Sequence, residues 1–159
     1  MTDRPADLND ARPTSVRHLI GHGHRRVGLI SGLAGLATTD ERVEGYRAAL
    51  EAAGIRFDPA LVKSGASVVD RARAACRALL DLETPPTAIV TANNLMTIGA
   101  MHALRDAGLR VPEDVALAGF DDIPIVRYVT PPLTSVRVAI AELGERAMAR
   151  LRHVVDVDG

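Results

Sequence analysis

Three polar residues each follow a short apolar run of the chain: Arg42 follows residues 27–31, Asn93 follows residues 87–92 and Asp121 follows residues 115–119. An Arg side chain offers a planar fork of donors, an Asn amide offers both a donor and an acceptor, and an ionised Asp offers only acceptors. This mixture suits a neutral polyhydroxylated ligand such as a sugar, a nucleoside or a base. A phosphate fits less well, because Asp121 and the adjacent Asp122 would repel an anion unless a metal ion intervened.

Each of these residues also has a purely structural interpretation. An Arg in the first turn of a helix is often solvated or paired with a carboxylate, and Asp40 is close in sequence. An Asn after a strand often caps the next helix, and Asn94 is the predicted cap, which leaves Asn93 for a ligand. An Asp at a strand end is often structural, and the Asp121–Asp122 pair favours a functional role only modestly.

The elements that must position these residues alternate along the chain. Strands are predicted at residues 27–31, 61–64, 87–92 and 115–119, with a further candidate at 135–138. Helices are predicted at residues 14–20, from 38 to Gly54, from 67 to the Pro-rich stretch at 84–86, at 95–107 and at 139–154. Strands that alternate with helices pair in parallel through right-handed crossovers, so the fold class is a doubly wound α/β sheet with helices on both faces. Ligands of such sheets bind beyond the carboxyl ends of the strands.

Several local signals set the predicted helix ends and faces. Thr38-x-x-Glu41 and Ser67-x-x-Asp70 have the spacing of a capping box, and Gly54 and Gly108 are predicted helix stops. The side chains predicted to face inward are Val43, Tyr46, Leu50 and Ala53 in one helix and Ala72, Cys76 and Leu79 in the next. The helix at 139–154 is amphipathic, with Ile140, Leu143 and Leu151 on one stripe, and we expect that stripe to be partly uncovered.

The composition excludes several classes of protein. The 159 residues fit one domain, and 47% hydrophobic residues can build a core. A net charge of −1 argues against a free-standing nucleic-acid binder, and the lone Cys76 argues against disulfides and a cysteine metal cluster. The chain lacks an apolar run of the length needed to span a membrane, and its polar first residues do not resemble a secretory signal, so a cytoplasmic location is expected.

Motifs for catalysis and for DNA reading are absent from these residues. The glycine spacings of dinucleotide and phosphate loops do not occur, and the only lysine, Lys63, is not placed as a receiver domain requires. There is no G-x-S-x-G elbow. His22-x-His24 is interpreted as a solvated turn rather than a metal site. We therefore expect no enzyme activity, no cofactor and no helix-turn-helix.

Four ordered segments resemble motifs of the LacI/GalR family of bacterial transcriptional regulators. They are HLIGHGHRRVG at residues 18–28, ERVEGYRAAL at 41–50, TAIVTANN at 87–94, and VPEDVALAGFDD at 111–122 followed by PPLT at 131–134. The resemblance implies a periplasmic-binding-protein-like effector domain in which a small molecule binds between two lobes and controls operator binding. Carried over by motif, Arg42, Asn93 and Asp121 match effector-contacting positions of the second lobe.

Residues 1–14 are rich in Asp, Arg and Pro and are predicted to be a flexible lead-in. The resemblance implies that residues 15–134 form the second lobe and residues 135–159 a return segment toward the first lobe. It implies a homodimer that contacts DNA only through a helix-turn-helix outside these residues. Asn94 stands where the family commonly has Asp, Ser67 where an aromatic residue often stacks on the ligand, and Val138 where a polar residue is frequent. These departures leave the effector unidentified.

Two other functions fit the same fold. A sugar-binding protein of a transport system shares it, but would carry a secretory signal and both lobes. A module that acts only by dimerisation is the second alternative, through the helix at 95–107 or the tail helix. In that case Gly99 could allow close packing against a partner.

Overall fold

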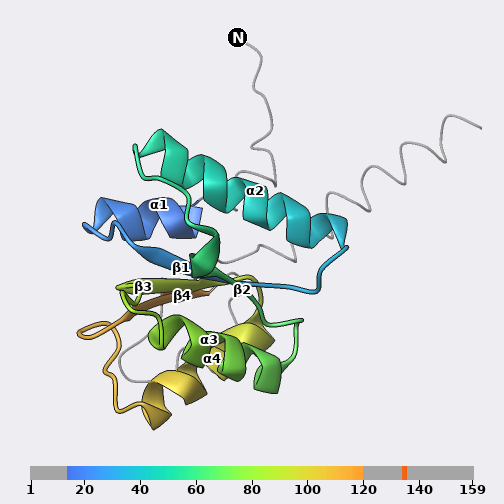
Figure 1. Cartoon of the computed structure of the whole chain (residues 1–159), viewed down its shortest axis with the longest axis vertical. Coiled ribbons are helices and arrows are strands. Elements are labelled where there is room, and N and C mark those ends of the chain that lie inside the picture. The colour runs from blue at the N-terminus through green and yellow to red at the C-terminus, as the bar shows by residue number, and fades with distance from the viewer. Residues whose placement is uncertain (1–13, 120–133, 136–159) are drawn as a thin grey trace, which may run out of the picture.

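The computed structural model describes residues 14–119 and 134–135, in which helices and strands alternate (Figure 1). The elements, in chain order, are α1 (Thr14–Gly21), β1 (Val27–Ser31), α2 (Ala37–Ala52), the 3-10 helix η1 (Pro59–Leu61), β2 (Val62–Ser64), α3 (Val69–Leu80), β3 (Ala88–Thr91), α4 (Asn94–Asp106), β4 (Ala116–Gly119) and β5 (Thr134–Ser135).

The strands form one sheet in the order β2-β1-β3-β4-β5, and every adjacent pair is parallel. This confirms the predicted doubly wound α/β fold. The strand predicted at 61–64 begins at Val62, because residues 59–61 form η1. The candidate strand at 135–138 is represented by β5, and residues 136–138 lie outside the described part of the chain.

Helices cover both faces of the sheet, which explains why the strands are continuous apolar runs. Figure 1 shows α1 and α2 on one face and α3 and α4 on the other. Successive residues of a strand point to opposite faces, so in β1 Leu29 packs with the α1/α2 layer and Ile30 with the α3/α4 layer. The predicted inward residues Tyr46, Leu50 and Cys76 are buried, as are Ala72 and Leu79, whereas Val43 and Ala53 are half-buried.

Helices α3 and α4 approach each other closely at Gly99. A Cβ atom on Gly99 would lie 2.3 Å from the carbonyl oxygen of Val69 and 2.7 Å from Cβ of Ala72. Side chains cannot occupy that space, so glycine is required for this helix packing. The hypothesis that Gly99 packs against a partner chain is therefore wrong, because α3 of the same chain occupies its surface.

The predicted helix stops are confirmed. Gly54 and Gly108 follow α2 and α4 with φ of +68° and +69°, a conformation that glycine adopts without steric cost. The predicted helix at 139–154, with Ile140, Leu143 and Leu151, lies outside the described residues.

Candidate functional site

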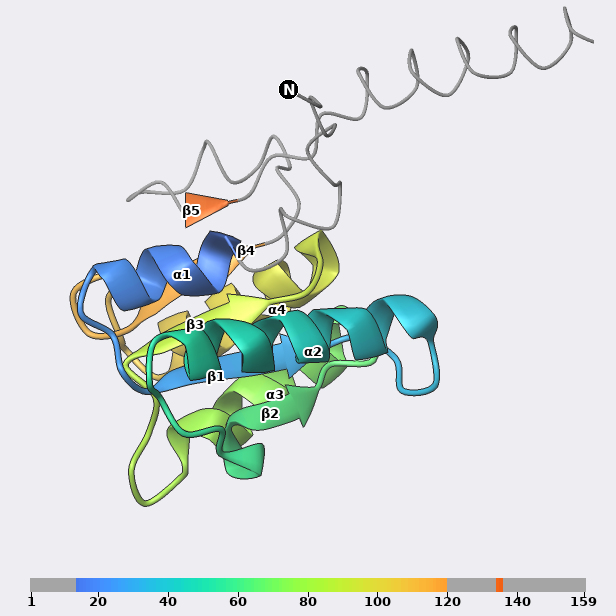
Figure 2. The same cartoon turned by 90° about the horizontal axis from the view of Figure 1, so that it is seen from above.

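The candidate site lies at the carboxyl edge of the sheet, where β1 and β3 end. From these two central strands the strand order runs outward in opposite directions, to β2 on one side and to β4 and β5 on the other. Such a reversal is the topological switch point at which doubly wound proteins bind ligands. The loop that follows β1 begins at Gly32 and leads to α2 (Figure 2). Asn93 lies directly before α4.

Asn93 has two roles at this edge. Its Oδ1 accepts a hydrogen bond of 3.0 Å from the backbone N–H of Met96, so Asn93 is the N-cap of α4. Its amide nitrogen forms no hydrogen bond with the part of the chain that the structure describes, and the residue is half-buried. The side-chain NH2 group of Asn93 can therefore donate to a ligand at the carboxyl edge, while its Oδ1 caps α4.

The prediction that Asn94 caps this helix is wrong. Asn94 is the first residue of α4, and its Oδ1 accepts from the neighbouring backbone N–H of Leu95 at 2.8 Å. Asn93 is extended, with φ of −157° and ψ of 176°, which is the backbone geometry of a cap residue. The chain leaves β3 one residue earlier than the spacing suggested, because β3 ends at Thr91.

Of the other two predicted site residues, the structure describes Arg42 but not Asp121. Arg42 lies in the second turn of α2, half-buried, and takes part in polar interactions within the protein. Asp121, and Asp122 beside it, lie outside the described residues. The structure thus places Arg42 and Asn93 in elements that begin at the carboxyl edge, and the role of Asp121 stays a prediction.

Both helices that begin beside β1 and β2 lack side-chain caps. The N-cap of α2 is Leu36 and that of α3 is Val68, and neither of these side chains forms a cap hydrogen bond. The predicted capping boxes at 38–41 and 67–70 are therefore wrong. Helix α2 starts at Ala37. The Thr39 side chain packs under the loop, with its Oγ1 2.8 Å from the position that a Cβ atom on Gly32 would take. Uncapped helix starts present backbone N–H groups that a ligand with oxygen acceptors can use.

The loop between β2 and α3 adopts a rare backbone conformation. Ala66 and Ser67 have φ of +47° and +58°, and the N–H of Val68 donates to the carbonyl of Gly65 at 3.0 Å. Positive φ at both central residues is the pattern of a type I′ turn, which usually takes Asn and Gly. An L residue in this region costs about 1 kcal/mol, and such strain is concentrated at functional sites.

Apolar side chains surround this edge. The large hydrophobic residues that remain exposed in the described part of the chain are Leu33 (50%), Leu36 (48%), Val68 (50%) and Leu95 (44%). All four follow the carboxyl ends of β1, β2 or β3. Sequence reasoning missed this apolar rim, although leucines beside the glycines of the loop at 32–36 were a usable signal.

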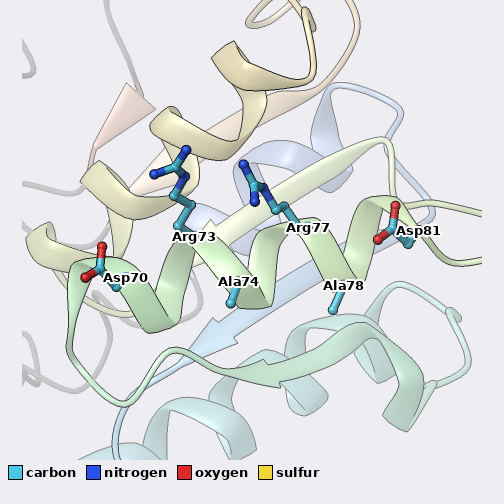
Figure 3. Close-up of a pocket in the computed structure, with 6 residues that line it drawn as sticks. All are labelled: Asp70, Arg73, Ala74, Arg77, Ala78 and Asp81. Carbon is cyan, nitrogen blue, oxygen red and sulfur yellow. The ribbon is translucent and has the colours of Figure 1, made fainter.

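A hollow of about 480 Å³ lies along α3, away from the carboxyl edge (Figure 3). Arg73 and Arg77 point toward α4, away from Ala74 and Ala78, and both guanidinium groups bond to Asp106 of α4. The hydrogen bond from Arg73 is the main cause that lowers the pKa of the Asp106 carboxyl. These charges link the two helices, and the other polar residues that line the hollow are Asp70 and Asp81. A lining of arginine and aspartate side chains differs from the amide and backbone donors of the carboxyl edge.

The amino edge of the sheet carries a smaller hollow, of about 230 Å³, between η1 and the end of α2. Its polar groups are mostly satisfied. Arg26 donates to the carbonyl of Thr84 at 2.7 Å and to Asp58 at 3.2 Å, and the Tyr46 hydroxyl donates to the carbonyl of Val27 at 2.7 Å. Burial, aided by Asp58, raises the pKa of Tyr46 to about 12. We interpret this edge as structural.

The described residues contain neither an activated thiol nor a cluster of three or more metal ligands. Burial raises the pKa of Cys76 to about 12, so its thiol is not poised as a nucleophile. No group of three or more His, Cys, Asp or Glu side chains in residues 14–119 could hold a metal ion. Within the same residues, each helix is too short or too polar to cross a bilayer.

The family of periplasmic binding protein-like domains matches residues 16–159. The chain belongs to this family. The transcriptional regulator CelR of Thermobifida fusca is 43% identical over 137 residues, which are 86% of this chain and 40% of that relative. The domain is therefore of the type found in LacI/GalR transcriptional regulators.

Solved structures agree with this assignment. A regulatory protein of the LacI family from Chloroflexus aggregans superimposes with a TM-score of 0.88 at 38% identity, over 93% of this chain and 53% of that structure. The CelR–cellobiose complex superimposes with a TM-score of 0.82 at 41% identity, over 91% of this chain and 44% of that structure. The chain thus spans about half the length, or less, of these relatives.

Proposed function

We propose that this chain is the second lobe of the effector-binding domain of a LacI/GalR-type transcriptional regulator. In this proposal residues 15–134 form the lobe, residues 135–159 return toward the first lobe, and residues 1–14 lead in. The effector is a neutral sugar-like or nucleoside-like molecule, and its binding controls the affinity of the whole regulator for its operator. The regulator is a cytoplasmic homodimer with no catalytic activity, and it reaches DNA through a helix-turn-helix outside these residues.

The observation that carries the proposal is the polar and apolar composition of the carboxyl edge. A sugar needs donors and acceptors on its hydroxyl groups and apolar contact with its C–H faces. The edge supplies the Asn93 amide and the uncapped starts of α2 and α3, with Arg42 in the second turn of α2, inside a rim that includes Leu33 and Leu95. We assign Asp121 to the same site as an acceptor. The cellobiose bound by CelR supports a carbohydrate as the first class to test.

A thermal-shift titration tests this proposal. The chain is titrated with cellobiose, other sugars and nucleosides, because a ligand that binds only the folded state raises the melting temperature. Asn93→Asp is the informative variant, since Asp accepts the Met96 hydrogen bond equally well and keeps the cap while it removes the amide donor. We expect the shift to disappear in Asn93→Asp, Arg42→Ala and Asp121→Ala.

Arg56→Ala is the matched control, because Arg56 is an exposed arginine at the opposite edge of the sheet. It should keep the full shift. A shift that survives Asn93→Asp and Arg42→Ala would place the ligand elsewhere and contradict the proposed site. The absence of a shift with every compound would contradict ligand binding by this lobe alone.

Self-association is a separate part of the proposal. Sedimentation velocity over a range of concentrations should show a mass that rises from monomer toward dimer. A strict monomer at every concentration would contradict the homodimer for this chain without affecting the ligand site.

A further inference from the structure

A pair of histidines on α1 remains outside the effector site. His18 and His22 are four residues apart, so they lie on the same face of the helix. The helical hydrogen bond pattern extends to this pair, because the backbone N–H of His22 donates to the carbonyl of His18 at 3.1 Å. The two ring centroids are 4.3 Å apart and both residues are exposed.

The hydrogen bonds of His22 fix which ring nitrogen can bind a metal ion. Nδ1 of His22 lies 2.8 Å from the carbonyl oxygen of His18. A carbonyl oxygen only accepts, so Nδ1 must carry the hydrogen, and in the neutral ring Nε2 holds a free lone pair. A backbone carbonyl on the second nitrogen is the usual support of metal-binding histidines, because it sets the tautomer and orients the ring.

We propose that His18 and His22 form a two-imidazole binding site for a divalent transition-metal ion such as Ni²⁺, Cu²⁺ or Zn²⁺. Imidazole nitrogen favours these ions, whereas Mg²⁺ and Ca²⁺ favour oxygen ligands. The remaining coordination positions are filled by water, since the described residues supply no third clustered ligand. The exposed Arg17 beside the pair repels cations and limits the affinity.

This site differs from the histidine spacing noted in the sequence. His24 does not join the pair, because it lies beyond the end of α1 and, among the described residues, its ring contacts neither His18 nor His22. Its Nδ1 lies 2.9 Å from the hydroxyl of Thr87. The Thr87 hydroxyl donates to the carbonyl of Arg26 at 3.4 Å, so it accepts from His24. His24 thus ties the turn to the amino end of β3, and the metal-binding pair is His18 with His22.

Retention of the untagged 159-residue chain on an immobilised Ni²⁺ column tests the site. We expect the chain to bind and to elute with imidazole, and His18→Gln and His22→Gln to pass through unretained. His102→Gln is the matched control, because His102 is a half-buried histidine on α4, and it should be retained like the parent chain. Calorimetric titration with Zn²⁺ should show affinity reduced at least about tenfold in either α1 variant.

A measurement on the unmodified chain keeps the test independent of variant folding. Substoichiometric Cu²⁺ should broaden amide NMR signals around residues 18–22 first. Failure of the parent chain to bind, retention by both α1 variants, loss of retention in His102→Gln, or broadening centred elsewhere would each overturn the proposal.

Discussion

The two edges of the sheet differ in how their polar groups are used. At the amino edge, Arg26 donates hydrogen bonds to Asp58 and to the carbonyl of Thr84, at 3.2 and 2.7 Å. The Tyr46 hydroxyl donates to the carbonyl of Val27 at 2.7 Å. At the carboxyl edge, two helices start without side-chain caps and a turn is strained. The amino edge therefore stabilises the fold, whereas the carboxyl edge keeps donors and apolar surface available at a cost in stability. Substitutions at the two edges should then have opposite effects on the free energy of unfolding.

The largest loss of stability is expected from Tyr46→Phe at the amino edge. The variant removes the 2.7 Å hydrogen bond to the carbonyl of Val27 in a buried position and should lower the free energy of unfolding by about 1–3 kcal/mol. Urea unfolding monitored by circular dichroism measures the change. No loss would mean that the amino edge is not stabilised as described.

Tyr46→Phe should also change how the stability of the chain depends on pH. Burial raises the pKa of Tyr46 to about 12 in the folded chain, above the ordinary value of about 10 for a tyrosine hydroxyl. The folded state therefore keeps the proton that the unfolded state releases, so stability is complete below pH 10 and is lost as the pH rises toward 12. Cys76, whose pKa is also raised to about 12, adds to this loss from about pH 9 upward. Melting temperatures should fall less steeply between pH 10 and 11 in Tyr46→Phe than in the parent chain.

A smaller loss, about 1 kcal/mol, is expected from Asp58→Ala. Asp58 pairs with Arg26 at 3.2 Å, and its other oxygen accepts from the N–H of Ala60 to cap η1. Asp58→Asn keeps the cap and removes the charge, so it should recover part of the loss. Chemical denaturation of the three chains separates the two contributions, and equal stability of all three would contradict them.

At the carboxyl edge, Ala66→Gly should stabilise the chain. Ala66 has φ of +47°, which glycine adopts freely, although the greater flexibility of glycine in the unfolded state offsets part of the gain. A net gain of about 0.5–1 kcal/mol is expected. Ala74→Gly is the control, because Ala74 is an exposed residue within α3, where glycine should destabilise by a similar amount. A loss of stability in both variants would mean that the turn is not strained.

A gain of the same size as that of Ala66→Gly is expected from Leu36→Asp. Leu36 has the extended backbone of an N-cap, with φ of −93° and ψ of 132°, but no side chain that can cap. An aspartate side chain there should accept a hydrogen bond from a backbone N–H of the first turn of α2 and add about 0.5–1 kcal/mol. Leu33→Asp, in the same loop and equally exposed, should leave the melting temperature unchanged. If both substitutions act alike, the effect comes from removing exposed apolar surface rather than from capping.

The candidate site was predicted from the sequence only in part. Its location and two of its residues, Arg42 and Asn93, follow from the rule that ligands bind where parallel strands end, and both lie in elements that begin at that edge. The strained turn at Ala66 and the uncapped helix starts could not be predicted, because backbone angles and caps depend on how the loops pack against one another. Thr39 illustrates this, since it packs against the loop at Gly32 within a helix that begins earlier than the capping pattern indicated.

The sequence by itself determined the alternation of strands and helices, the stops at Gly54 and Gly108, and the burial of Tyr46 and Cys76. These depend on hydrophobic periodicity and on the conformational freedom of glycine, which are local properties. Only the tertiary structure decided which asparagine caps α4 and that Gly99 packs against α3 of its own chain. It also decided that His18, rather than His24, faces His22. Each of these depends on atoms brought together by folding, and a one-residue shift in where a strand ends changes which side chain reaches its partner.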